Sequence, residues 1–246
     1  MVPNSCRNYF IDPLLCLMDF LEGTTLLVDK PYEWTSFDVV NKLRWNIKQH
    51  FNLKKVKVGH AGTLDPLATG LLVICVGKHT KKIDEYMVGK KEYTGTILLG
   101  KTTPSYDLET SFDSESSTEG ITSEKIIEAA SQLTGMIQQV PPVFSAKQVD
   151  GKRAYDLARE GKPVELKSNM VQVDLFETDV TRFPEVDFRI VCSKGTYIRS
   201  LAHDMGQALG CGGTLIALRR TKSGDFSIAD ALQVEDCIAY IRALPK

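Results

Sequence analysis

The chain has 246 residues, of which 43% are hydrophobic and 25% are charged, and its net charge at pH 7 is −1. These values are ordinary for a globular protein, and no apolar run reaches the roughly 18 residues that a membrane-spanning helix needs. The six cysteines are scattered without a C-x-x-C pair, and there are only four histidines. This argues against a disulfide framework and a zinc site, so we expect a reduced, cytoplasmic protein without a structural metal.

The first patterned segment predicts a strand followed by a helix. Leu26–Val28 is a short apolar run, and Thr35 and Asp38 have the spacing of a capping box at a helix start. Lys42 and Lys48 fall away from the apolar stripe of this helix and should face solvent. The stripe itself is expected at near-helical spacing and consists of Phe37, Val40, Leu43, Ile47 and Phe51.

The stretch GHAGTLDPLATG, Gly59–Gly70, places Asp65 directly before a proline in a glycine-rich segment. Proline disfavours helical backbone for the residue before it, so we expect Asp65 on an extended loop. The apolar run Leu71–Val76 that follows predicts a buried strand. A carboxylate at the edge of a buried strand is suited to act as a nucleophile or a base, and an Asx turn explains the same spacing.

The remaining elements interleave strands and helices without regular βαβ alternation, which predicts an α+β fold with a mixed, largely antiparallel sheet. Further strands are expected over 93–99, 171–175 and 186–192. The pattern predicts helices over 124–133 (ended by Gly135), 153–159, 198–209 and 234–241, an exposed loop over 111–122 and a turn over 210–213.

Charge is segregated along the chain although the net charge is close to zero. Lys42–His60 carries six lysines and arginines and no acid, whereas Asp107–Glu128 carries seven acids and one lysine. Such a basic stretch forms either a solvated helix face or a surface that binds phosphates.

Six blocks of this sequence, in order along residues 20–230, resemble those of the TruB family of RNA pseudouridine synthases. The Asp65 block, extended to GHAGTLDPLATGLLVICVGKHTK, is similar to the catalytic motif of that family. The other blocks are LLVDKP with WTSFDVV, KKEYTG, PPVFSAKQVDGKRAYDLAREG, CSKGTYIRSLAHDMG and ALRRTKSGDF. Two departures from the family pattern are Glu33, where a glycine is usual, and the less acidic stretch Thr103–Tyr106.

The resemblance implies the pseudouridine synthase fold, with a curved sheet, flanking helices and a central RNA-binding cleft. It also implies an isomerase that converts the uridine at position 55, in the T-loop of tRNA, to pseudouridine. The glycosidic bond is broken, the base turns, and the bond is remade through a carbon, so no cofactor is required. The uridine must leave its stack before a side chain can reach it. We expect tRNA as the partner and a monomer that needs no protein partner.

The resemblance also assigns roles to individual residues. Asp65 matches the family's nucleophilic or base-abstracting carboxylate, and Arg199 matches the arginine proposed as its cationic partner. Tyr93 matches the tyrosine that stacks on the target base. The remaining matches are Tyr197 as a second pocket tyrosine, Leu218 as an apolar wall, His60 as a contact to the flipped-out loop, and Asp107 as a further acid.

RNA-backbone contacts are expected from two basic stretches. The family has an insertion that clamps the T-loop, and residues 138–167 correspond to it. We expect residues 1–17 to be an N-terminal extension without signal-peptide character, and residues 18–246 to form the catalytic domain without a C-terminal PUA domain. The candidate contacts are Lys54, Lys55 and Lys57 in one stretch and Lys147, Lys152 and Arg153 in the other.

Two other classes of protein compete with this interpretation. A non-catalytic RNA-binding or tRNA-folding protein on the same scaffold would not need Asp65, Tyr93 and Arg199 together. An Asp-dependent hydrolase of a phosphate or sugar substrate would be expected to show a metal cluster or paired carboxylates, and the sequence shows neither signature.

Overall fold

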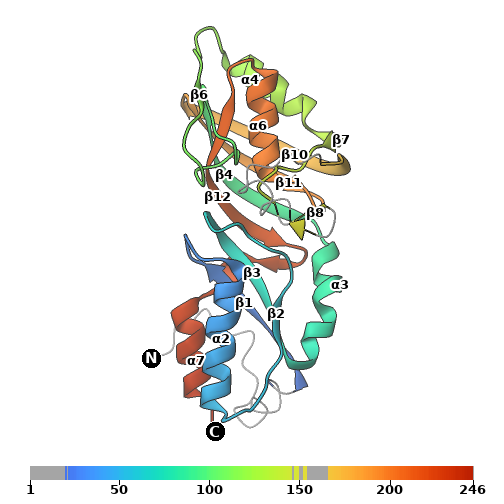
Figure 1. The fold of residues 1–246 in the computed structure, drawn as a ribbon, viewed down its shortest axis with the longest axis vertical. Helices are drawn as coiled ribbons and strands as arrows, with labels where there is room; N and C mark the ends of the chain where they lie inside the picture. The colour runs from blue at the N-terminus through green and yellow to red at the C-terminus, as the bar shows by residue number, and fades with distance from the viewer. Residues whose placement is uncertain (1–19, 21, 146, 150–151, 154–165, 246) are drawn as a thin grey trace. The chain divides into compact units, whose positions relative to one another are not determined.

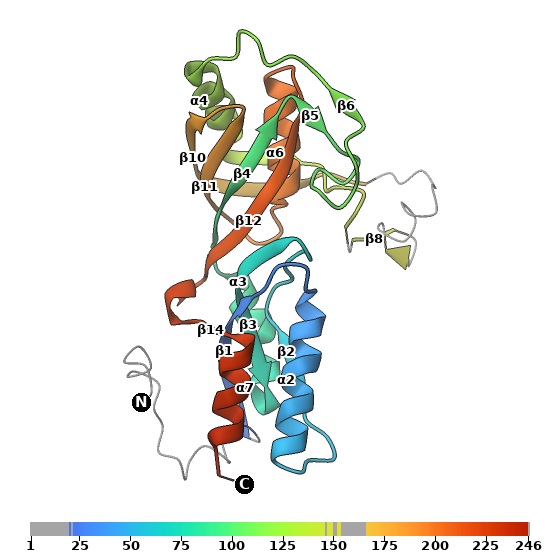
Figure 2. The ribbon, with the colours of Figure 1, turned by 90° about the vertical axis from the view of Figure 1, so that its left-hand side faces the viewer.

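The computed structural model describes residues 20, 22–145, 147–149, 152–153 and 166–245 (Figures 1 and 2). They divide into two compact units. Unit 1 takes the described residues up to Gly89 and from Arg219 onward, and unit 2 is Lys90–Leu218. In this described part of the chain, no helix has the length and apolar character needed to cross a membrane.

Unit 1 is built on a sheet with the strand order β14-β1-β3-β12, in which only the part of β12 from Arg219 onward belongs to this unit. Strands β1 and β3 are antiparallel, with Val28 opposite Leu72, and β14 is parallel to β1. The short strands β2 and β13 pair with β3 and β12. The bounds are Thr24–Lys30 for β1, Val58–His60 for β2, Ala68–Val76 for β3, Gly213–Ser223 for β12, Phe226–Ser227 for β13 and Leu232–Gln233 for β14.

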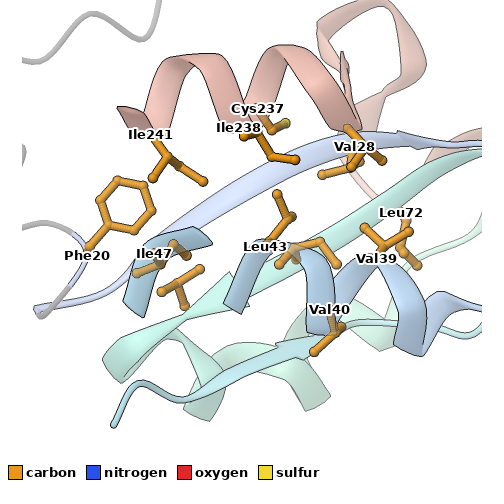
Figure 3. Packing of buried hydrophobic residues seen from close by; sticks show 13 residues of the cluster. Phe20, Val28, Val39, Val40, Leu43, Ile47, Leu72, Cys237, Ile238 and Ile241 are labelled. Carbon is orange, nitrogen blue, oxygen red and sulfur yellow. The ribbon is translucent and has the colours of Figure 1, made fainter. Parts of the chain in front are cut away.

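Two helices, α2 (Ser36–His50) and α7 (Val234–Ala243), pack on this sheet and on each other. Their buried side chains form the main core of unit 1, and Figure 3 shows them meeting those of β1 and β3. The predicted capping box is confirmed, since Thr35 and Asp38 bond reciprocally at the start of α2. The smaller elements of the unit are the 3-10 helices Gly77–Lys82 and Ile228–Asp230 and the helix α3 (Ile83–Val88).

The predicted apolar stripe of α2 is wrong at its first member. Val40, Leu43 and Ile47 are buried as expected, but the side chain of Phe37 is 57% exposed. Phe37 lies three residues before Val40, and the buried face of α2 runs through Val39 instead. Near the end of a helix, the 3.6-residue period is compatible with a buried face that includes either Phe37 or Val39. Packing against α7 and the sheet buries Val39.

Unit 2 contains the sheet path β12-β4-β11-β10-β7, in which β4, β11, β10 and β7 pair in antiparallel fashion. The mixed, largely antiparallel sheet predicted from the sequence is therefore confirmed. The bounds are Lys91–Leu99 for β4, Gly135–Gln139 for β7, Asn169–Arg182 for β10 and Glu185–Cys192 for β11. Two small ladders pair β5 (Lys101–Thr102) with β6 (Ser114–Glu115) and β8 (Gln148–Val149) with β9 (Lys152–Arg153).

Strand β11 buries Val186, Phe188, Ile190 and Cys192 on one face, as the alternation predicts. In β10 the alternation breaks, because the register with β11 shifts between Val173 and Leu175. A bulge of this kind turns the following residues to the opposite face, so Phe176 is buried in place of Leu175.

The helices α4 (Ser123–Gln132) and α6 (Ile198–Ala208) contact each other in unit 2, and α4 also contacts β10 (Figure 1). Both helices agree with the sequence pattern, as does the turn at Gly210. The predicted loop over 111–122 contains the short strand β6. In the predicted helix 153–159, Arg153 belongs to strand β9, and residues 154–159 lie outside the described residues.

Helix α6 approaches β12 most closely at Gly206. A Cβ atom on Gly206 would lie 2.1 Å from the backbone nitrogen of Gly213, far inside van der Waals contact. Glycine is normally unfavourable within a helix, by about 1 kcal/mol relative to alanine. Its presence in α6 is therefore explained by the close approach of two backbones.

We expect Gly206→Ala to destabilise the protein, although alanine is the better helix former. Overpacking of this kind costs about 1–3 kcal/mol or more, because neither backbone is free to move aside. The melting temperature measures the effect, with Gln207→Ala on the exposed side of the same helix as the control. A melting temperature equal to or higher than that of the wild type for Gly206→Ala would show that α6 and β12 do not approach this closely.

Candidate active site

Asp65 lies on the loop between β2 and β3, as the sequence predicts. It directly precedes the turn at Pro66–Leu67, and its carbonyl oxygen accepts a 3.1 Å hydrogen bond from the backbone N–H of Ala68. The residue is half-buried. The carboxylate is therefore carried by a short, closed turn at the start of a buried strand.

The loop is held on one side by α2. The hydroxyl of Ser36 donates to the carbonyl oxygen of Leu64 at 3.1 Å and accepts from the backbone N–H of Leu64 at 2.8 Å. Ser36 is the first residue of α2 and is buried. The Ser36 hydroxyl thus bonds both the N–H and the carbonyl of Leu64, the residue immediately before Asp65. These two bonds fix the position of the backbone that leads into Asp65.

Arg220 of β12 holds the same loop from another direction. Its guanidinium donates to three backbone carbonyls, those of Leu71 at 2.8 Å, Gly62 at 3.1 Å and Thr63 at 3.4 Å. The residue is only 1% exposed. A planar fork of five donors is suited to this task, because it can bind several carbonyls without losing its fixed geometry.

Lys30, at the end of β1, is the second buried cation of this loop. Its ammonium group donates to the carbonyls of Trp34 at 2.5 Å, Pro31 at 2.8 Å and Pro66 at 3.1 Å. Burial lowers the pKa of Lys30 to about 8, and the negative charge of Asp65 opposes this shift. Asp65 is therefore close enough to Lys30 to interact with its charge. The sequence pattern does not single out Arg220.

His60 ends strand β2, opposite Ile74 of β3. Burial, with the charge of Arg220 as a smaller cause, lowers the pKa of His60. Within the described part of the chain its buried Nδ1 atom has no hydrogen-bond partner. A neutral imidazole with an unused ring nitrogen can accept or donate a hydrogen bond to a ligand, depending on its tautomer.

In unit 2, Tyr93 lies in β4 opposite Ile190 of β11 and is 9% exposed. Strand β12, which carries the half-buried Leu218, passes very close to β4. A Cβ atom on Gly95 would lie 2.2 Å from the carbonyl oxygen of Ala217. Tyr93 and Leu218 therefore belong to neighbouring strands of one sheet.

Arg199 and Asp107 form a buried ion pair in unit 2, with Arg199 Nε 3.6 Å from Asp107 Oδ2 and exposures of 4% and 8%. Arg199 also donates to the carbonyl oxygen of Ser105 at 3.3 Å. Asp107 accepts from the backbone N–H of Glu109 at 3.0 Å. The resemblance supports a role for Asp107 only weakly, whereas the structure brings it together with Arg199. The pairing of Arg199 with Asp65 would join residues of different units and stays a prediction.

Tyr197 precedes α6, and its backbone is fixed by Gln139 at the end of β7. The amide of Gln139 accepts from the N–H of Tyr197 at 2.8 Å and donates to its carbonyl at 3.1 Å. Near the start of the helix, the hydroxyl of Ser200 donates to the carbonyl of Val140 at 2.7 Å. The start of α6, which positions both Tyr197 and Arg199, is thereby anchored to a distant part of the chain.

The loop that carries Asp107 has a second contact with α6 that the sequence does not reveal. The ring of Tyr106 stacks on His203 with centroids 3.9 Å apart and planes at 14°. Arg199 and His203 are four residues apart and lie on one face of the helix. Tyr106 and Asp107 are consecutive in the loop, and they contact His203 and Arg199, which lie one turn apart on α6. Tyr106 has φ 65°, so its backbone is in the left-handed region.

The candidate RNA-backbone residues fall in both units. Lys54, Lys55 and Lys57 are exposed in the segment between α2 and β2. Lys147 donates to the carbonyl of Lys167 at 3.2 Å and to the side-chain oxygen of Asn169 at 3.1 Å. Lys152 and Arg153 form strand β9. Among the described residues, no cluster of three or more His, Cys, Asp or Glu side chains is arranged to hold a metal ion.

Comparison with known proteins identifies the class to which this fold and loop belong. Residues 48–198 match the model of "TruB family pseudouridylate synthase (N terminal domain)", and residues 199–243 match "tRNA pseudouridylate synthase B C-terminal domain". The α+β fold described above is the pseudouridine synthase fold, and a member of this class is an isomerase. The chain belongs to the TruB family.

Individual relatives support this assignment. The chain is 55% identical to tRNA pseudouridine synthase B of Phocaeicola vulgatus, over 89% of this chain and 93% of the relative. The protein of the same name from Flavobacterium johnsoniae is 52% identical, over 88% and 95%. Among solved structures, a Cbf5-Nop10-Gar1 complex superimposes with a TM-score of 0.69 at 29% identity, covering 95% of this chain and 59% of the solved chain. An H/ACA RNP bound to a substrate RNA containing 2'-deoxyuridine gives 0.66 at 26%, covering 96% and 61%.

We expect Asp65→Asn to lower the pKa of Lys30 further below its value of about 8, because the substitution removes the negative charge that favours the ammonium form. A pH titration of the Lys30 side-chain signals by NMR measures the change. The control is Asp230→Asn, an exposed acid in the same unit that is not among the causes of the Lys30 shift. An unchanged or raised pKa of Lys30 would show that the Asp65 carboxylate does not face it.

We expect Arg199→Ala and Asp107→Ala each to destabilise the protein by about 3–5 kcal/mol, because each removes one member of a buried ion pair. The double variant should lose clearly less than the sum of the two single losses. Denaturant unfolding of the four proteins provides this cycle. Additive losses would mean that the two side chains do not interact.

Proposed function

We propose that this chain converts a uridine in the T-loop of tRNA, at position 55, to pseudouridine. Relatives 50–55% identical that span most of the chain are named tRNA pseudouridine synthase B, which supports tRNA as the substrate. One solved relative is described as bound to a substrate RNA. The chemistry is an isomerisation, since the base is detached, turned and reattached with no atom gained or lost.

The observation that carries the proposal is the way in which Asp65 is presented. Three buried side chains, Ser36, Arg220 and Lys30, bond the backbone around it, and the positive charge of Lys30 acts on its carboxylate. A nearby cation favours the ionised form of a carboxyl group, which is the form needed by a nucleophile or a base. Because the loop is fixed before substrate arrives, little reorganisation is needed during the reaction.

The other candidate residues complete the proposed site. An aromatic ring such as that of Tyr93 can stack on a base without fixing its rotation, which suits a base that must turn. Tyr197 and Leu218 are proposed as further walls of the pocket, and His60 as a contact to the RNA loop. Arg199, held by Asp107, is proposed to act on the Asp65 carboxylate.

The basic residues are proposed to bind the RNA backbone. Lys54, Lys55 and Lys57 are exposed and lie in a stretch that contains no acid, which supports contact with phosphates. Lys147, Lys152 and Arg153 are proposed to act in the same way from the insertion. The proposal includes a monomer that works in the cytoplasm, where tRNA is made and used.

We expect Asp65→Asn to reduce pseudouridine formation by roughly a thousandfold or more while tRNA binding persists, because the change keeps the shape of the side chain and removes its charge and basicity. The measurement incubates the protein with an unmodified tRNA transcript and maps pseudouridine, with Asp230→Asn as the control.

Two outcomes would contradict the proposal. Wild-type turnover in Asp65→Asn would remove Asp65 from the mechanism. Tight binding of the transcript by the wild-type protein without any pseudouridine would instead support a non-catalytic tRNA-binding protein.

A further inference from the structure

The outer face of α2 presents aromatic rings and cations to solvent. We call its members Phe37, Asn41, Lys42, Arg44, Trp45 and Lys48 the aromatic–basic face. Trp45 and Phe37 are each 57% exposed, whereas the opposite side of the helix is buried in the core of unit 1. Packing against α7 and the sheet therefore does not explain why two large aromatic rings occur on this face of α2.

The aromatic–basic face borders an open pocket of about 760 Å³. Trp45 and Lys42 line it, and so do residues of the turn before the helix. Its full lining is Glu33, Trp34, Asp38, Asn41, Lys42, Arg44, Trp45 and Lys48. The pocket is thus formed by one helix face and its N-terminal turn, all within unit 1.

The charge of this face favours an anionic ligand. Asp38 is the only acid in α2, and it is engaged by the backbone and hydroxyl of Thr35 at the helix start. Every later charged side chain of the helix is basic, and the exposed Lys54, Lys55 and Lys57 follow it without an intervening acid. In the lining of the pocket, the three basic residues Lys42, Arg44 and Lys48 outnumber the two acids Glu33 and Asp38. A surface with an excess of positive charge attracts phosphates.

The arrangement of rings and cations distinguishes RNA from a protein ligand. The Arg44 guanidinium lies over the ring of Phe37 at 5.7 Å from its centroid, and its Nη2 also donates to Asn41 Oδ1. Protein interfaces are enriched in aromatic residues and arginine but depleted in lysine, whereas Lys42 and Lys48 flank Trp45. Stacking rings between phosphate-binding cations are typical of surfaces that bind unpaired nucleotides.

We propose that the aromatic–basic face of α2 binds an unpaired segment of RNA, with a base stacked on Trp45 and phosphates bound by Lys42, Arg44 and Lys48. The inference rests on the proposed function for the identity of the RNA, which is the tRNA substrate away from its target uridine. An unpaired segment is required because the bases of a duplex stack on each other and leave no free face for a side chain.

The same helix links this surface to the Asp65 loop. Ser36, in the first turn of α2, holds Leu64 directly before Asp65, and Trp45 follows nine residues later. At about 1.5 Å per residue, the two points are roughly 14 Å apart along the helix axis. RNA bound on the aromatic–basic face is therefore held at a set distance from the candidate nucleophile.

The test measures binding of an unmodified tRNA transcript to four variants. Trp45→Leu should weaken binding about 5- to 150-fold, the effect of losing one stacked base, and Trp45→Phe should restore most of it. The triple change K42Q/R44Q/K48Q should weaken binding and reduce the slope of log affinity against log salt by about 0.7–0.9 for each phosphate that is no longer neutralised. The control K81Q/K82Q/K125Q removes three exposed charges elsewhere and should bind like the wild type.

Two results would overturn the proposal. The first is wild-type affinity in both Trp45→Leu and the α2 triple variant, with melting temperatures showing that both are folded; the face would then be a protein-binding or merely solvated surface. The second is an equal effect of Trp45→Leu on a blunt RNA duplex, which has no unpaired base to stack.

The pseudouridine assay separates this inference from the proposed function. Weakened binding in the α2 variants would support the RNA surface even if the wild-type protein formed no pseudouridine. Wild-type affinity in the α2 variants, together with normal pseudouridine formation, would overturn only the RNA surface.

Discussion

The structure around Asp65 depends on two buried cations that bind backbone rather than acids. Lys30 and Arg220 each donate to three carbonyl oxygens, and those of Gly62, Thr63 and Pro66 belong to the loop that carries the aspartate. A loop carbonyl removed from water must find a donor, and a charged donor forms a stronger bond than a neutral one. The interactions that fix the loop therefore also place positive charge around it, where a carboxylate is stabilised.

Unit 2 uses a related arrangement at the start of α6. Gln139 bonds both backbone groups of Tyr197, Arg199 pairs with Asp107, and His203 stacks on Tyr106. Each contact ties the helix to a segment far away in sequence. A helix held at several points along one face positions its side chains more precisely than an isolated loop would, which suits residues proposed to act on a substrate.

Local patterns in the sequence predict much of the fold, because the interactions behind them are local. The capping box of Thr35 is one example, and the alternation from Val186 to Cys192 is another. Strand β12 is not predicted by such a pattern, because its charged residues Arg219 and Arg220 interrupt the apolar alternation. Arg220 bonds inside the protein, and the partly exposed Arg219 pairs with Asp29. The role of Arg220 in the Asp65 loop is equally hidden, because it joins segments about 150 residues apart. The Asp65 loop itself is predictable from a motif, and the roles of the site residues come from resemblance.

The division of the chain has a consequence for its synthesis. Unit 2 is one continuous stretch, whereas unit 1 is assembled from segments on either side of it. On the ribosome, β1, α2 and β3 emerge long before β12 and α7, so the apolar side of α2 waits without its partner helix. Unit 2 is free to fold first, against the usual order in which the N-terminal part leads. During that interval Leu43 and Ile47 lack the α7 side chains that pack against them in the folded unit.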